Sequence, residues 1–143
     1  MEALERLTRR QLDVLRAVQA TATSERGAPL NSIAMSLSIS APSALQHLTA
    51  VEELGLVSRY RGKSRLSARG ELTLAEYRRH HRIAESLFGN LGLSPREVCR
   101  AAQEVDLALS HLTIERLCDA EGHPSVCPHG EPIPPCSGRR GAG

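Results

Sequence analysis

Residues 31–67 constrain the fold of this 143-residue chain more than any other stretch of the sequence. A short amphipathic segment, 31–37, is followed by a tight turn and by a second helical segment, 41–54. Ser40 is placed to cap the second helix, and Pro42 suits its first turn, where a missing backbone N–H costs nothing. Two helices joined in this way predict a helix-turn-helix whose second helix is the recognition helix.

A basic hairpin is predicted directly after the recognition helix. Residues 56–67 alternate apolar and polar side chains around Gly62, which is typical of two antiparallel strands joined by a tight turn. Four cationic side chains, Arg59, Arg61, Lys63 and Arg65, lie on or near the tip of this hairpin. A hairpin in this position is the wing of a winged helix and places its cations against phosphates. An ordinary core helix followed by a solvated turn is the alternative, and the order of the two features argues against it.

We therefore predict that the first part of the chain binds double-stranded DNA. Gln46 is the candidate for recognising an adenine edge, because its amide can form two hydrogen bonds there, although a glutamine that merely faces solvent is the alternative. The predicted DNA-binding residues are Ser40, Pro42, Ser43, Gln46, His47, Arg59, Arg61, Lys63 and Arg65.

Apolar spacing predicts further helices on both sides of this motif. Thr8 is a candidate cap for an N-terminal helix, and a long helix is expected over 72–90. Ser94 and Ser110 are placed to start two more helices. Prolines make residues 123–136 unsuited to helix or central strand, so an extended arm is expected there.

The composition agrees with a mainly α fold. Hydrophobic residues make up 41% of the chain but aromatic residues only 2%, so the core must be aliphatic and mostly helical. We predict a winged helix-turn-helix domain over 1–71, a helical domain over 72–136 and a disordered tail over 137–143. No apolar run is long enough to cross a membrane and the N-terminus is not a signal peptide, so a cytoplasmic protein is expected.

His81, Glu85 and Cys99 form a candidate metal site. His81 and Glu85 are four residues apart in the long predicted helix and share a face, and Cys99 lies in the next helix. Imidazole, carboxylate and thiolate are competent ligands for Zn²⁺ or Fe²⁺. A hydrogen-bonded helical pair is the alternative for His81 and Glu85. By contrast, His80 and His111 are expected at exposed helix positions.

Several short segments carry one shared pattern, and they are residues 39–43, 54–57, 79–85, 109–110 and 128–134. Together they resemble the diphtheria toxin repressor and manganese-transport regulator family of metal-dependent transcription regulators. The resemblance implies a winged helix-turn-helix, a helical dimerisation and metal-sensing domain, and a homodimer on a palindromic operator. Its recognition helices would lie about one helical turn, roughly 34 Å, apart. The chain is too short for the SH3-like third domain that some members carry.

The resemblance also implies two metal sites. One family site uses His, Glu and a second His, and the corresponding residues here are His81, Glu85 and Cys99. The regulatory family site is expected to be eroded, because its positions hold Arg10, Gln103, Asp106 and Leu107, with Asp13 one turn after Arg10. An ion pair between Arg10 and Asp106 is our hypothesis for what replaces the metal bridge at that site.

Thiols and imidazoles also gather towards the C-terminus. The candidates for a second metal, cluster or redox site are Cys118, Cys127, His129 and Cys136. Soft thiolates favour Zn²⁺, Cu(I) or an iron-sulfur cluster over Mn²⁺. Simple burial is the equally weighted alternative, because a free cysteine often packs as a small apolar side chain.

The sequence thus predicts a homodimeric regulator, a repressor of metal and most of all iron homeostasis, that responds to Fe²⁺, Zn²⁺ or Mn²⁺. The alternative is an iron-sulfur or thiol redox sensor of the same fold that uses Cys118, Cys127 and another cysteine. A zinc enzyme or a helical interaction module is disfavoured, since no general base beside an open metal position is visible in the sequence.

Overall fold

The computed structural model describes residues 2–23 and 26–135, and they form two compact units. One unit comprises residues 6–74, and the other combines residues 75–135 with the short helix α1 (Glu2–Glu5). The predicted boundary at 71/72 lies three residues before this division. Cys136 and the predicted tail 137–143 lie outside the described residues. Over the described ranges, no helix is both long and apolar enough to span a membrane.

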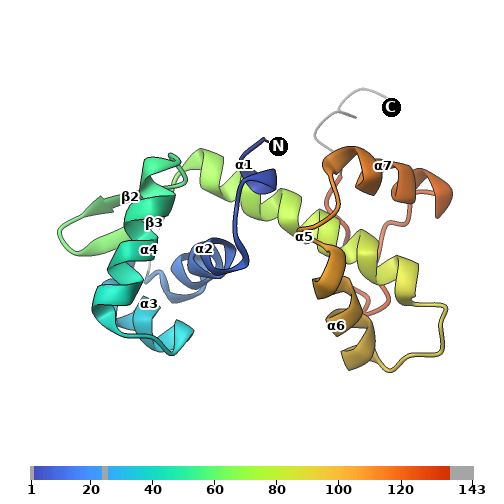
Figure 1. Cartoon of the computed structure of the whole chain (residues 1–143), viewed down its shortest axis with the longest axis horizontal. Coiled ribbons are helices and arrows are strands. Elements are labelled where there is room, and N and C mark those ends of the chain that lie inside the picture. The colour runs from blue at the N-terminus through green and yellow to red at the C-terminus, as the bar shows by residue number, and fades with distance from the viewer. Residues whose placement is uncertain (1, 24–25, 136–143) are drawn as a thin grey trace. The chain divides into compact units, whose positions relative to one another are not determined.

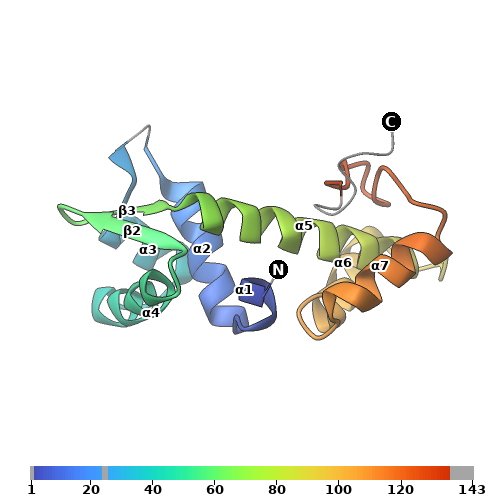
Figure 2. The same ribbon diagram turned by 90° about the horizontal axis from the view of Figure 1, so that it is seen from above.

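The first unit is a winged helix-turn-helix, as predicted (Figures 1 and 2). Its elements are α2 (Arg9–Thr21), β1 (Ala28–Pro29), α3 (Leu30–Leu37), α4 (Ala41–Glu53), β2 (Val57–Tyr60) and β3 (Lys63–Leu66). The antiparallel sheet has the order β1-β3-β2, and Val57 pairs with Leu66 at the base of the wing. The two-residue strand β1 was not predicted. It adds a third strand beside β3.

Aliphatic side chains from the three helices form the core of this unit. Fully buried positions are Leu12, Leu15, Val18, Ile33, Leu48, Val51 and Leu56. Local signals set the ends of the helices. Thr8 forms a capping box with Gln11 at the start of α2, and Ser40 Oγ accepts a hydrogen bond from the backbone N–H of Ser43 at 3.2 Å. The recognition helix α4 therefore begins where the sequence predicts.

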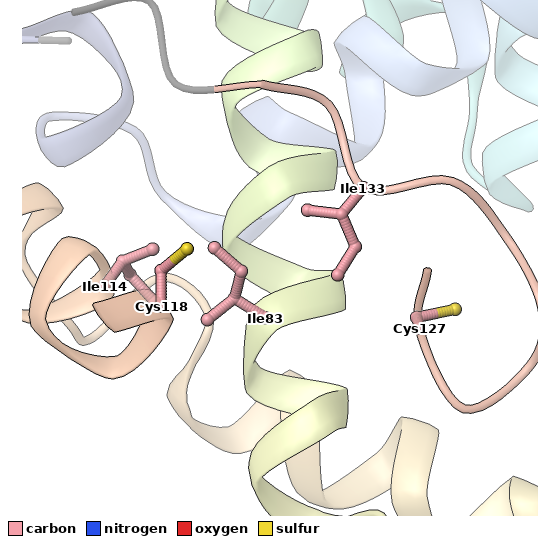
Figure 3. Close-up of a cluster of buried hydrophobic side chains, with 5 residues drawn as sticks. All are labelled: Ile83, Ile114, Cys118, Cys127 and Ile133. Atoms are coloured by element: carbon pink, nitrogen blue, oxygen red, sulfur yellow. The ribbon is translucent and has the colours of Figure 1, made fainter. Parts of the chain in front are cut away.

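The second unit contains most of α5 (Ala68–Phe88), together with α6 (Pro95–Val105), α7 (His111–Ala120) and an extended arm (Figures 1 and 2). The arm folds back on itself through a bridge between Val126 and Pro132. The core of the second unit contains Ile83, Ile114, Cys118, Cys127 and Ile133 (Figure 3). The arm is thus a packed part of this unit, although it contains no helix.

Helix α6 depends on a capping box at its start. Ser94 Oγ accepts a hydrogen bond from the backbone N–H of Glu97 at 3.3 Å, and Glu97 Oε2 accepts one from the backbone N–H of Ser94 at 2.7 Å. Ser94→Ala should lower the free energy of unfolding by about 1 kcal/mol, because one backbone donor loses its partner. Chemical denaturation measures this change. An unaltered midpoint would contradict the capping role.

Candidate metal centre

Helices α5 and α6 bring His81, Glu85 and Cys99 together. His81 Nε2 lies 3.3 Å from Glu85 Oε1, and Cys99 Sγ lies 3.7 Å from His81 Nε2. Tetrahedral zinc, with Zn–N of about 2.0 Å and Zn–S of about 2.3 Å, separates its ligand atoms by about 3.3–3.5 Å. The two separations from His81 are therefore already near those that one such cation requires, and the donor atoms of Cys99 and Glu85 lie within 4.8 Å of each other.

Asp106 orients the imidazole of His81. Its Oδ2 lies 2.9 Å from His81 Nδ1 and accepts a hydrogen bond from the Tyr77 hydroxyl, also at 2.9 Å. Asp106 is fully buried, and the Tyr77 ring stacks on the His81 ring with centroids 5.9 Å apart. A carboxylate on Nδ1 fixes the proton there and leaves the Nε2 lone pair for a metal. The sequence did not reveal this role of Asp106, because the contact joins α5 to the residue that ends α6.

The arm adds two more donors on the other side of Glu85. Donor atoms of Glu85, Cys127 and His129 all lie within 4.8 Å of one another. His129 Nε2 lies 2.9 Å from the carbonyl oxygen of Pro95, a contact in which the ring donates its N–H and keeps its lone pair on Nδ1. That Nδ1 is close to Glu85 Oε2. Two lone pairs that face each other repel unless a proton or a cation lies between them.

Glu85 is the shared residue of these two donor sets. It is buried, and no hydrogen bond of acceptable geometry satisfies its Oε2 among the described residues, despite the nearby His129. Oε1 faces His81, whereas Oε2 faces His129. A buried carboxylate with an unsatisfied oxygen is costly without a partner, so the residues present fit a bound divalent cation.

Two arginines of α5 hold the arm beside this centre. Arg79 pairs with Glu115 at 2.6 Å and donates to the carbonyl oxygen of Pro134 at 3.2 Å, and Arg82 donates to the carbonyl oxygen of Pro132. Burial acts to lower the pKa of Arg79, but Glu115 and Cys118 outweigh it and raise the pKa. These roles were not predicted from the sequence, in which the arginine-rich run 78–82 was the available signal.

The wing presents a cationic surface. A concave region of about 460 Å³ lies beside the wing. It is lined by Arg26, Ser58, Tyr60, Arg61, Lys63 and Arg65. Tyr60 is 74% exposed, and the Arg61 guanidinium lies 5.2 Å from the centre of its ring. On the recognition helix, Gln46 and Pro42 are exposed, as is the capping Ser40, whereas Ser43 and His47 are partly buried. Together with the wing cations, these residues stay the candidate DNA contacts.

Arg59 differs from the other predicted wing cations. Its guanidinium makes paired hydrogen bonds with Glu52, at 2.9 and 3.3 Å, and so ties β2 to the end of α4. The hydrogen bond from Arg59 lowers the pKa of Glu52. Because this guanidinium is already paired, Arg59 is placed to support the wing rather than to contact phosphate freely.

Residues 67–135 match the family model described as iron dependent repressor, metal binding and dimerisation domain, and residues 4–66 match the LexA DNA binding domain. Together the two matches span residues 4–135 and confirm the predicted resemblance to the diphtheria toxin repressor family of metal-dependent regulators. No curated protein sequence matches it significantly.

Solved structures agree with this family assignment. The hypothetical protein SSo2273 from Sulfolobus solfataricus is 29% identical with a TM-score of 0.84, over 90% of this chain and all of that one. IdeR from T. acidophilum is 25% identical with a TM-score of 0.66, and a manganese-dependent transcriptional repressor in complex with manganese is 28% identical with a TM-score of 0.71. The matches cover 90% and 88% of this chain, but only 60% and 59% of those two proteins.

The positions of the family's regulatory site hold few good ligands. Arg10 is exposed on α2, and Asp13 lies 3.8 Å from Arg16. Gln103 donates to Cys99 Sγ at 3.8 Å, and Asp106 contacts His81 and Tyr77 as described above. The proposed ion pair between Arg10 and Asp106 joins different units and stays a prediction.

The iron-sulfur alternative finds no support in the family members or in the arrangement of the thiols. Cys118 belongs to none of the donor groups found among the described residues. Figure 3 places the side chains of Cys118 and Cys127 on opposite sides of α5, with Ile83 and Ile133 between them. Cys127 instead lies with Glu85 and His129, so the structure separates two residues that the sequence had grouped.

Proposed function

We propose that this regulator is a homodimeric repressor whose affinity for operator DNA is controlled by a divalent metal at the Glu85 centre. The proposal rests mainly on the carboxylate of Glu85, which belongs to both donor sets. One set adds His81 and Cys99 to Glu85, and the other adds Cys127 and His129. We infer two neighbouring metal positions that share Glu85.

The donor types favour particular metals. Each position combines one thiolate, one imidazole and the carboxylate, and a thiolate favours Fe²⁺ or Zn²⁺ over the harder Mn²⁺. Bound there, the cation would neutralise Glu85 and replace the repulsion between its oxygens and the imidazole lone pairs by attraction. The residues themselves link α5, α6 and the arm. A bound metal thereby favours one packing of the helical unit. It raises the affinity for DNA only by the factor by which the metal binds the DNA-competent state more tightly than the other state.

A second copy of the chain is the proposed partner of the helical unit. Large apolar side chains are exposed on this unit: Leu91 is 63% exposed and Leu112 is 60% exposed. An exposed apolar surface of this kind fits a dimer interface, and two symmetric heads fit a palindromic operator.

The wing should supply much of the salt-dependent DNA affinity. Arg61→Ala and Lys63→Ala should each reduce the slope of log affinity against log salt by about 0.9, since each removes one phosphate contact. Fluorescence anisotropy across a salt series measures the slope. Arg100→Ala removes an exposed charge in the other unit and serves as the control. If both wing variants had the same salt slope as the control, the wing would not contact the DNA phosphates.

The hydrogen bond between Asp106 and His81 should matter for metal affinity. Asp106→Asn should weaken binding by about 10–100-fold, because an amide cannot stabilise the required His81 tautomer as a carboxylate does. Competition with a chelator measures the affinity. Glu104→Gln, which changes an exposed residue two positions earlier in α6, is the control. Equal affinities in the two variants would exclude the orienting role.

The proposed function is tested by selecting DNA from a random pool with zinc-loaded protein. We expect inverted repeats with half-sites about one helical turn apart. Affinity for the selected site should then fall when the metal is removed from the wild type, and the Glu85→Gln variant should bind weakly in either condition. DNA affinity that is high and independent of metal would contradict the proposal.

A further inference from the structure

A second cluster of ligand-type side chains lies between α5 and the start of α7, and the proposed metal centre uses none of its members. Glu76 Oε1 lies 3.0 Å from His80 Nε2 and 2.7 Å from His111 Nδ1. The two ring nitrogens are 3.5 Å apart, and the rings stack with centroids 5.7 Å apart. Three donor atoms from two helices therefore face one point.

His80 is the unexpected member of this cluster. The sequence predicted an exposed position, but the side chain is only 2% exposed, so that prediction is wrong. Its Nδ1 is buried and has no hydrogen-bond partner among the described residues. The imidazole therefore makes its polar contacts through Nε2, at the point that Glu76 and His111 share.

We propose that Glu76, His80 and His111 form a further binding site for a divalent transition metal such as Zn²⁺. Two imidazoles and one carboxylate are a ligand set that holds zinc with an open position, and the same set suits Fe²⁺. The site lacks a thiolate, which separates it chemically from the Glu85 centre.

Charge and access favour a cation at this point. Glu5 Oε1 accepts a hydrogen bond from the backbone N–H of His111 at 3.2 Å, so a second carboxylate lies beside the cluster. Glu76 and His111 are partly buried, with side-chain exposures of 11% and 19%. A cation can therefore enter from the edge. The two separations from Glu76 Oε1, 3.0 and 2.7 Å, need only small shifts to reach about 3.3 Å, and the separation between the two ring nitrogens is already 3.5 Å.

The site should bind more weakly than the Glu85 centre. A metal on Nε2 leaves the proton of His80 on Nδ1, where the described residues offer no acceptor. The loss of such outer-shell support costs about 10–100-fold in affinity. The site would therefore fill only after the Glu85 centre.

A Co²⁺ titration of the full chain tests this site. Cobalt bound to a thiolate shows a charge-transfer band in the near ultraviolet, whereas cobalt bound only to nitrogen and oxygen shows d–d bands without it. We expect an early phase with the charge-transfer band and a later phase that adds d–d absorption alone. Glu76→Gln and His111→Ala should remove the later phase and leave the early one unchanged, while the control His123→Ala, which removes an exposed imidazole, should keep both.

Three results would overturn the proposed site. They are the absence of a later phase in the wild type, a later phase of equal size in Glu76→Gln and His111→Ala, and loss of the charge-transfer band in these variants. Circular dichroism identifies any variant that does not fold, and Glu76→Asp, which keeps the carboxylate, should recover part of the later phase. The proposed function fails separately, through the absence of the early charge-transfer band.

Discussion

Replacing Glu85 by glutamine should weaken metal binding at the proposed centre by more than about 100-fold, beyond the effect of losing an outer-shell partner. The reason is that both donor sets depend on the same carboxylate: Oε1 faces His81, and Oε2 faces His129. An amide keeps the volume of the side chain but loses the negative charge and replaces one ligand oxygen by an N–H donor. Chelator competition with Zn²⁺ measures the affinity.

The control for this substitution is Glu104→Gln, the same change at an exposed position of α6. It should bind metal like the wild type. The two variants have the same net charge, so nonspecific attraction of the cation cannot account for a difference between them. Metal affinity retained by Glu85→Gln within a few-fold would show that the metal binds elsewhere.

Ile83→Ala should destabilise the helical unit by about 2–5 kcal/mol, the usual cost of removing a large buried aliphatic side chain. Ile83 is fully buried on α5, in the same cluster as Cys118 and Cys127 (Figure 3). The substitution leaves a cavity under both α7 and the arm. Thermal unfolding of the metal-free variant measures the loss.

Metal should recover part of this stability. Zinc that binds only the folded state adds about 2.7 kcal/mol when its free concentration is 100 times the Kd. The midpoint of unfolding of Ile83→Ala should therefore rise with zinc. In an Ile83→Ala chain that also carries Glu85→Gln, the rise should shrink to the smaller contribution of the weaker site at Glu76, His80 and His111. A rise of equal size in the double variant would place the stabilising metal outside the Glu85 centre.

Local signals made the first unit predictable. Ser40 caps α4, and the positive φ of Arg61 and Gly62, 51° and 75°, forms the tight turn of the wing that the alternating pattern predicts. The starts of α6 and α7 follow the same rule, because Ser94 and Ser110 cap them. Each of these features depends on residues within a few positions of one another, so they can be predicted without knowledge of the tertiary structure.

Contacts between distant segments could not be predicted in the same way. The helical spacing placed His81 beside Glu85, but the approach of His129 depends on how the arm folds back over α5. The pairing of Arg59 with Glu52 could not be predicted for a similar reason, and a phosphate contact of Arg59 stays a prediction. The family resemblance supplied Cys99 as a ligand position. It gave no indication that Asp106 contacts His81.

X-ray absorption at the zinc edge tests the central claim most directly. Protein loaded with less than one equivalent of zinc fills the tighter positions at Glu85 first. We expect a first shell with at least one sulfur at about 2.3 Å and nitrogen or oxygen at about 2.0–2.1 Å. Cys99 and Cys127 would supply that sulfur. A first shell of nitrogen and oxygen alone would contradict the proposed centre.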